Sequence, residues 1–153
     1  MDGQILRHLE KCDEIWHAGD FGSTSVSEAL AAVAPLRGVY GNIDDQAIRL
    51  LHPHTLQFRV EALDVYLTHI GGYPGKYQTE VRKTLKASPP HLFICGHSHI
   101  LRIMPDPSLN NMLHINPGAA GRHGFHQVRT LVTFEVEQDK IQALKVVELG
   151  KRV

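Results

Sequence analysis

Short apolar runs that end in a polar residue recur along the chain, and segments with a helical pattern separate them. The runs end near Asp20, Asn42, His69 and His97. Apolar positions with a helical period predict helices over 5–12, 26–34, 44–51 and 76–87. A strand, a helix and a second strand at the spacing seen around Asp20 and Asn42 predict a right-handed βαβ unit with a parallel sheet.

The rest of the pattern predicts mainly strands. Residues 56–60 and 63–69 alternate about a short turn and predict a hairpin, whereas the glycine-rich segment 71–75 predicts a loop without regular structure. After residue 100 the pattern predicts only strands, over 101–104, 112–115, 128–136 and 140–147. We therefore expect an α/β protein, with two packed sheets and helices outside them, that forms one domain over residues 1–153.

Composition removes several classes of function. The 16 Lys and Arg residues balance the 16 Asp and Glu residues, so charge gives no reason to expect a nucleic acid or an anionic membrane as partner. No apolar segment approaches the ~18 residues that span a bilayer, and the N-terminus lacks a basic region followed by an apolar one. Cys12 and Cys95 form no C-x-x-C motif and are expected to be buried free thiols. We expect a cytoplasmic protein.

The polar residues at the strand ends are of types that bind metals. His97 and His99 are two positions apart, so in an extended segment both imidazoles face the same side. The carboxyl ends of strands in an open α/β sheet form the edge where ligands bind. This edge would collect one carboxylate, one carboxamide and three imidazoles, from Asp20, Asn42, His69, His97 and His99. Because Asp and Asn also cap turns, the alternative is a purely structural role.

Four motifs occur in a fixed order, each after an apolar run: Gly19-Asp20, Gly41–Asp44, His69 and Gly96–His99. Together they resemble the calcineurin-like metallophosphoesterase family, in particular its small bacterial and archaeal single-domain phosphodiesterases. The resemblance implies a four-layer α/β/β/α sandwich with two divalent metals at the strand ends. It also implies that Asp20 bridges the metals, that Asn42, His69 and His97 complete one site, and that His99 belongs to the other.

The sequence departs from the family pattern at two places. In the family, the second metal also takes an Asp and a His from an Asp-x-His motif that ends the first strand. Here no apolar run precedes Asp2, the residue two positions on is Gln4, and His8 lies in a predicted helix. We therefore expect the first strand to be missing, with one complete metal position and half of another. Ile43 stands where many members carry a histidine that protonates the leaving group, a contribution of about 10²–10⁴-fold.

The expected reaction is hydrolysis of a small phosphodiester by a metal-activated hydroxide, with Asp20, Asn42 and His97 as catalytic residues. Mixed oxygen and imidazole ligands suit Mn²⁺, Fe or Zn²⁺ better than Ca²⁺ or Mg²⁺, and Mn²⁺ is our first expectation. With only one complete metal position, we expect slow turnover or none. The alternative is an inactive scaffold, because the family includes a retromer coat subunit that uses this fold mainly for protein contacts.

Other histidines and one arginine leave alternatives open. Arg122, His123 and His126 follow the loop that begins at Asn116 and either reach a substrate phosphate or belong to a solvated loop; Arg122 and His123 are the predicted substrate contacts. His17 alternates within a strand and is expected to be structural. A missing first strand would leave unpaired backbone groups at a sheet edge, which predicts a homo-oligomer, a dimer or larger.

Overall fold

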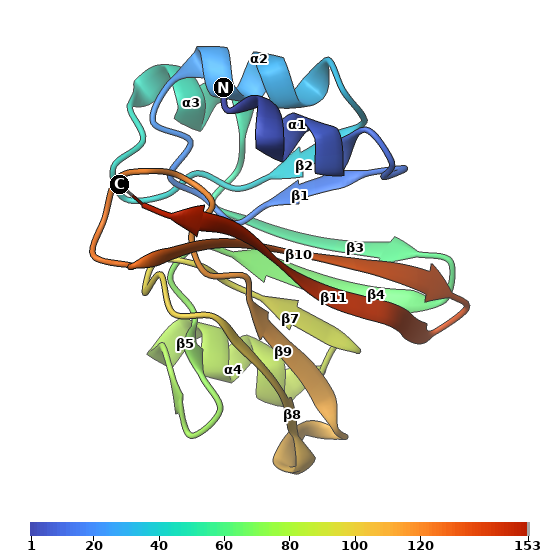
Figure 1. The fold of residues 1–153 in the computed structure, drawn as a ribbon. Helices are drawn as coiled ribbons and strands as arrows, with labels where there is room; N and C mark the ends of the chain where they lie inside the picture. The colour runs from blue at the N-terminus through green and yellow to red at the C-terminus, as the bar shows by residue number, and fades with distance from the viewer. Residues whose placement is uncertain (153) are drawn as a thin grey trace.

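The computed structural model describes residues 1–152 as four stacked layers, with three helices on one side of the strands and α4 on the other (Figure 1). The first layer holds the helices α1 (Gly3–Leu9), α2 (Thr24–Ala31) and α3 (Gln46–Leu51). The second layer holds the strands β1 (Ile15–His17), β2 (Leu36–Gly38), β10 (Val128–Glu137) and β11 (Lys140–Lys151).

The third layer is a five-stranded sheet in the order β3-β4-β7-β9-β8. Its strands are β3 (Thr55–Val60), β4 (Leu63–Thr68), β7 (Leu92–Ile94), β8 (Arg102–Asp106) and β9 (Met112–Asn116). The fourth layer is α4 (Thr79–Ala87), preceded by the short hairpin β5 (Gly72–Tyr73) and β6 (Lys76–Tyr77). A 3₁₀ turn over Pro107–Leu109 joins β8 to β9.

Apolar side chains fill the spaces between the layers. In β4, Val65 and Leu67 face the core between the two strand layers, while Tyr66 faces the core under α4. This is the two-residue alternation of a strand that is covered on both faces. A third core lies between β1, β2 and the helices α2 and α3, and includes Ile15 and Ile48. These three cores confirm the four-layer α/β/β/α arrangement.

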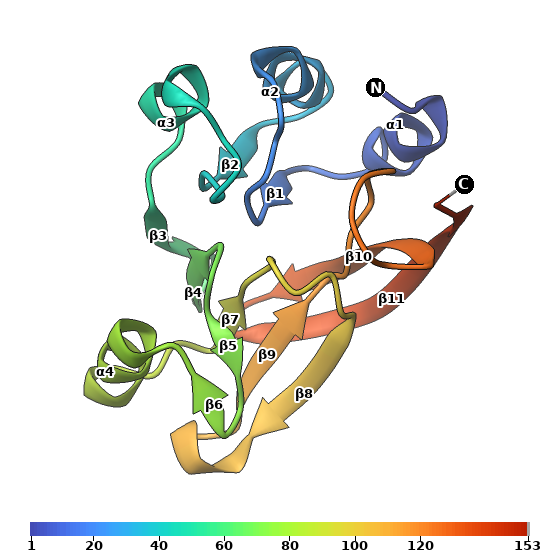
Figure 2. The same ribbon diagram turned by 90° about the vertical axis from the view of Figure 1, so that its left-hand side faces the viewer.

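The second layer consists of two separate strand pairs. β1 and β2 are parallel, as the βαβ pattern predicts, and β10 and β11 are antiparallel. No backbone ladder joins the two pairs within residues 1–152, and Figure 2 shows them as distinct pairs with α1 nearby. Ahead of β1 the described chain forms helix α1 rather than a strand. Asp2 caps this helix and also lies 2.7 Å from the Arg129 guanidinium of β10.

The expected structure of residues 71–78 was wrong. The segment 71–75 is not an irregular loop, because Tyr73 and Lys76 pair in the β5–β6 hairpin around Pro74 and Gly75. Gly75 has φ of 89°, the left-handed conformation that glycine adopts without strain after a proline in such a turn. Helix α4 consequently begins at Thr79 rather than near Lys76, with the Gln78 side chain accepting a hydrogen bond from the Val81 N–H at 3.0 Å.

Candidate metal centre

Asn42 lies at the centre of a cluster formed where four strands end. Asp20 follows β1, Asn42 follows β2, His69 directly follows β4, and His97 follows β7. The Asn42 Oδ1 atom is 2.9 Å from His69 Nε2 and 3.0 Å from His97 Nδ1. Asp20 Oδ2 is 3.3 Å from the same His69 nitrogen. The structure therefore brings four of the predicted ligands together from segments that are far apart in the sequence.

The hydrogen bonds of His69 determine which of its nitrogens faces this cluster. His69 Nδ1 is 2.7 Å from the Ala18 carbonyl oxygen, which can only accept, so Nδ1 carries the proton. In the neutral ring Nε2 then presents a lone pair toward the oxygens of Asn42 and Asp20. Three acceptor atoms facing one another repel unless a cation or a proton lies between them. This donor set fits a divalent cation with mixed oxygen and nitrogen ligands.

The amide of Asn42 is essential to this set. Within residues 1–152, no group of three or more His, Cys, Asp or Glu side chains is placed to hold a metal ion. The cluster becomes a plausible coordination sphere only when the neutral Asn42 oxygen is counted with Asp20, His69 and His97. An asparagine ligand gives the centre less negative charge than a second carboxylate would.

The backbone is strained at three of the predicted ligands. Asp20, His97 and His99 have φ of 61°, 68° and 59°, in the left-handed region that few non-glycine residues occupy. Each such conformation costs about 1–3 kcal/mol and concentrates at functional sites. These three residues lie in the loops that leave β1 and β7, and the left-handed backbone sets the directions in which their side chains leave it. Positive φ also occurs outside these loops, at Glu61, Asn110, Asn111, Gln138 and Ala143.

Asp44 is a site residue whose role the sequence did not reveal. It is 4% exposed, and its carboxylate accepts hydrogen bonds from the backbone N–H groups of Phe21, Gly22 and Gly41 at 3.1, 2.8 and 2.8 Å. These bonds fasten the loop that carries Asp20 to the loop that carries Asn42. Asp44 therefore positions two candidate ligands without facing the cluster itself.

Asn116 has the same function for the loop after β7. Its Nδ2 donates to the Gly96 carbonyl at 2.9 Å and to Ser98 Oγ at 3.0 Å, while its Oδ1 accepts from the Gly118 N–H at 3.1 Å. Because Asn116 is 3% exposed, these bonds are shielded from water. The Asn116 loop thus holds the turn from which His97 and His99 project.

His99 lies beside His126, with 3.3 Å between their Nδ1 atoms. His126 is 9% exposed, so its alternative assignment to a solvated loop was wrong. The pKa of His99 is lowered, first by burial and then by the neighbouring His126 ring, while the nearby Asp20 carboxylate opposes the shift. His99 is thus close enough to Asp20 for their charges to interact.

Arg122 and His123, the two predicted substrate contacts, lie outside the cluster around Asn42. Arg122 is exposed and lies 3.3 Å from the Asp2 carboxylate, with which it forms an ion pair. His123 is also exposed. Because both lie on the loop that ends at His126, they remain near the same end of the strands, but no described contact joins them to Asn42 or its neighbours.

His17 is structural, as expected from its alternation. Its Nδ1 accepts a hydrogen bond from the Gly19 N–H at 3.1 Å, and its ring stacks on Phe21, which in turn stacks on His52. Burial lowers the pKa of His17 to about 4, so the ring is neutral near pH 7. His17 thereby supports the turn that leads to Asp20.

Comparison with known families decides the classification. The family model of the calcineurin-like phosphoesterase superfamily domain matches residues 1–139. The chain belongs to this superfamily. A phosphoesterase of this superfamily is a hydrolase, and its members generally bind divalent metals.

Individual relatives agree with this classification. A probable metallophosphoesterase of Methanothermobacter thermautotrophicus is 30% identical over 105 residues, which are 69% of this chain and 59% of the relative. The matched part thus spans less than two thirds of that phosphoesterase.

Solved structures show the same fold. Vps29 from Entamoeba histolytica in complex with zinc has a TM-score of 0.73 at 14% identity, covering 100% of this chain and 91% of that one. A novel archaeal phosphodiesterase has a TM-score of 0.71 at 20% identity, covering 95% and 88%. At such low identity the likeness supports the four-layer phosphoesterase fold alone.

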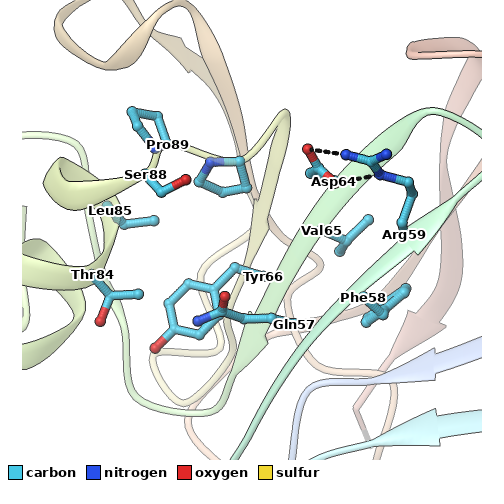
Figure 3. Close-up of a pocket in the computed structure, with 11 residues that line it drawn as sticks. Gln57, Phe58, Arg59, Asp64, Val65, Tyr66, Thr84, Leu85, Ser88 and Pro89 are labelled. Atoms are coloured by element: carbon cyan, nitrogen blue, oxygen red, sulfur yellow. Dashed lines mark hydrogen bonds and ion pairs between the residues drawn. The ribbon is translucent and has the colours of Figure 1, made fainter.

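A surface pocket of about 370 Å³ lies away from these ligands, between the β3–β4 hairpin and the end of α4 (Figure 3). Arg59 and Asp64 form a hydrogen-bonded ion pair on one side of it, and Ser88 and Pro89 lie on the other. None of the candidate phosphoesterase ligands lines this pocket.

Within the described chain, no helix is both long and apolar enough to cross a membrane.

Proposed function

We propose that this chain is a metal-dependent phosphodiesterase whose centre comprises Asp20, Asn42, His69, His97 and His99. The observation that carries the proposal is the convergence of atoms that can bind a metal: Asn42 Oδ1 lies within 3.0 Å of ring nitrogens from both His69 and His97. Such an arrangement has a physical reason if a cation binds there. Phosphodiester hydrolysis is the proposed reaction because the motifs resemble those of the small phosphodiesterases of this family, and an archaeal phosphodiesterase has the same fold.

The chain's own residues hold and orient the reacting groups. Asp20 supplies the carboxylate of the cluster, and His69 is fixed by its bond to the Ala18 carbonyl. His97 comes from the loop after β7, the strand that runs parallel to β4 beside it. A bound divalent metal would supply activation of water and neutralise charge on the phosphoryl group. Arg122 and His123 are proposed to contact the phosphate from the neighbouring loop, which requires Arg122 to leave Asp2.

Mn²⁺ is the proposed native metal, with Fe, Zn²⁺ and Ni²⁺ as alternatives. Two or more imidazoles and two oxygens, without a thiolate, suit each of these ions, and their availability in the cell decides among them. The zinc complex of the Entamoeba Vps29 supports including Zn²⁺ in any test. Slow turnover is expected, because His99 and a shared Asp20 are the only proposed ligands of a second metal.

The test is to measure bound metal per chain together with hydrolysis of bis-p-nitrophenyl phosphate, with and without added Mn²⁺ or Zn²⁺. We expect at least one metal per chain and a metal-dependent rate that the His97→Ala variant abolishes. The matched control is His54→Ala, which removes an exposed histidine outside the cluster. A chain that binds no metal under any of these conditions would contradict the proposal.

The second candidate function is that of an inactive scaffold for protein contacts. For either function we also propose that the chain self-associates, because in the second layer β1 pairs only with β2 and β10 only with β11 among the described strands. Open strand edges can pair with another chain. Light scattering coupled to size-exclusion chromatography is expected to give a dimer or larger species, whereas a stable monomer at all concentrations would count against self-association.

A further inference from the structure

The loop from Gly121 to His126 is packed against His99. The His99 and His126 rings meet edge to face, with centroids 5.1 Å apart and an interplanar angle of 78°. A methyl group added at Gly124 would overlap the His99 ring, so the loop backbone approaches that ring as closely as a glycine allows. His126 is only 9% exposed and His99 is partly buried, so the contact is shielded from solvent on the His126 side.

Hydrogen bonding determines the proton positions in this pair. His126 Nε2 lies 2.9 Å from the Gly121 carbonyl oxygen, and since a carbonyl only accepts, Nε2 must carry a proton. The Nδ1 atom of the neutral ring is then an acceptor. It lies 3.3 Å from His99 Nδ1, which must therefore donate. His99 is left with a single lone pair, on Nε2.

We propose that His126 is a positioning residue that keeps the proton of His99 on Nδ1 and thereby offers His99 Nε2 to a second cation beside Asp20. The proposal rests on the metal-centre function proposed above. It gives His99 the same arrangement as His69, whose Nδ1 donates to the Ala18 carbonyl while Nε2 faces the cluster. Partners of this kind fix the tautomer of a metal-binding histidine, and their loss lowers metal affinity about 10–100-fold.

A competing arrangement has a different signature. If His126 were itself a ligand of the same cation, both Nδ1 atoms would need free lone pairs, and His99 would carry its proton on Nε2. The two arrangements thus differ in the tautomer of His99 before any metal is added. They can be separated without measuring activity.

The first measurement is a long-range ¹H–¹⁵N correlation spectrum of the histidine rings in metal-free protein near pH 8. We expect the proton on Nδ1 in His99 and on Nε2 in His126. A His99 ring protonated on Nε2 in the wild-type protein would overturn the proposal. The spectrum reports the tautomer of His99 whether or not any metal binds.

The second measurement is calorimetric titration of the metal-free protein and its variants with Mn²⁺. His126→Phe keeps a ring but removes both hydrogen bonds, and it should weaken the second binding event about 10–100-fold while leaving the first unchanged. His126→Gln should restore most of the loss, because its amide can accept from His99 and donate to Gly121. The neighbouring exposed Gln127→Ala is the matched control.

The results test the role of His126 separately from the proposed metal-centre function. An unchanged second event in His126→Phe, or no recovery in His126→Gln with its fold intact, would overturn the role of His126 while the centre around Asn42 stands. Absence of any Mn²⁺ binding to the wild-type chain would instead contradict the metal-centre function. In that case the wild-type tautomer of His99 still decides whether His126 orients it.

Discussion

The Asp44 carboxylate accepts a 2.8 Å hydrogen bond from the backbone N–H of Gly22, which lies 22 positions earlier in the chain. The same carboxylate accepts from Phe21 and Gly41. One buried side chain therefore satisfies three backbone donors from the two loops that present Asp20 and Asn42. Without it, the buried N–H groups of Phe21 and Gly41 would have to find other acceptors.

The Asp44→Ala variant is expected to lose about 3 kcal/mol or more of unfolding free energy, since each buried donor left unpaired costs about 1–3 kcal/mol. Urea unfolding at neutral pH measures the loss. The control is Asp45→Ala, because Asp45 accepts only one bond, from the Ile48 N–H at the start of α3, a cap contribution of about 1 kcal/mol. Equal losses in the two variants would show that Asp44 does not tie the loops together.

Gly41 gives Asp20 the room that it needs. A methyl group at position 41 would overlap the Asp20 carboxylate and the Asp20 backbone nitrogen. Gly41→Ala should therefore displace Asp20 and weaken metal binding about 10-fold or more, measured by calorimetric titration with Mn²⁺. The control, Gly3→Ala, adds the same methyl where nothing lies within 4 Å. Unchanged affinity in Gly41→Ala would mean that Asp20 contributes little to binding.

His114 makes the stability of the fold depend on pH. It is buried in β9 against Phe93, and neither ring nitrogen has a hydrogen-bond partner within residues 1–152. Burial lowers its pKa from 6.5 to about 4. Between these values the unfolded chain binds a proton that the folded chain does not, so stability falls as the pH drops from 6.5 to 4.

The His114→Leu variant should remove part of this dependence. Each such histidine contributes at most about 1.4 kcal/mol per pH unit, and His17 retains its own contribution. Urea unfolding at several pH values should give a smaller slope in the variant and equal or greater stability at neutral pH, because two unpaired nitrogens are gone. An exposed control, His54→Leu, should keep the wild-type slope. An unchanged slope in His114→Leu would assign the acid sensitivity to other groups.

The sequence alone located the residues that follow a strand. Asp20, Asn42, His69 and His97 could be predicted because apolar runs identify strands, and the carboxyl ends of strands share an edge. Asp44 and His126 could not, because their functions depend on contacts that no local pattern encodes. Asp44 resembled an ordinary turn or helix-start residue, and His126 pairs with a histidine 27 positions away.

The β5–β6 hairpin and the divided second layer were also missed because they depend on which segments pair, which no local pattern encodes. Pro74 and Gly75 are equally compatible with an irregular loop and with a tight turn, and only the pairing of Tyr73 with Lys76 decides between them. The divided second layer was also not predictable in detail, since hydrophobic alternation shows that a strand has a buried face but not which strand lies beside it.

Ile43 provides a test of the reaction itself. It is 64% exposed, and its backbone N–H lies 3.3 Å from Asp20 Oδ1, so its backbone is next to the proposed centre. A histidine at this position could protonate a leaving group, which typically accelerates a reaction about 10²–10⁴-fold when the leaving group is poor. Ile43→His should therefore accelerate hydrolysis of an alkyl phosphodiester much more than that of bis-p-nitrophenyl phosphate, whose leaving group needs no proton.

The decisive quantity is the ratio of kcat/KM for the two substrates, compared between the wild type, Ile43→His and Ile43→Gln. The glutamine variant has a polar side chain of similar reach that cannot act as an acid near neutral pH, so it should keep the wild-type ratio. The gain in Ile43→His should also decline as the pH rises through the pKa of the new imidazole, since only the protonated ring donates. An unchanged ratio in Ile43→His would mean that position 43 does not face the leaving group, and that the substrate lies in another orientation across Asp20 and Asn42.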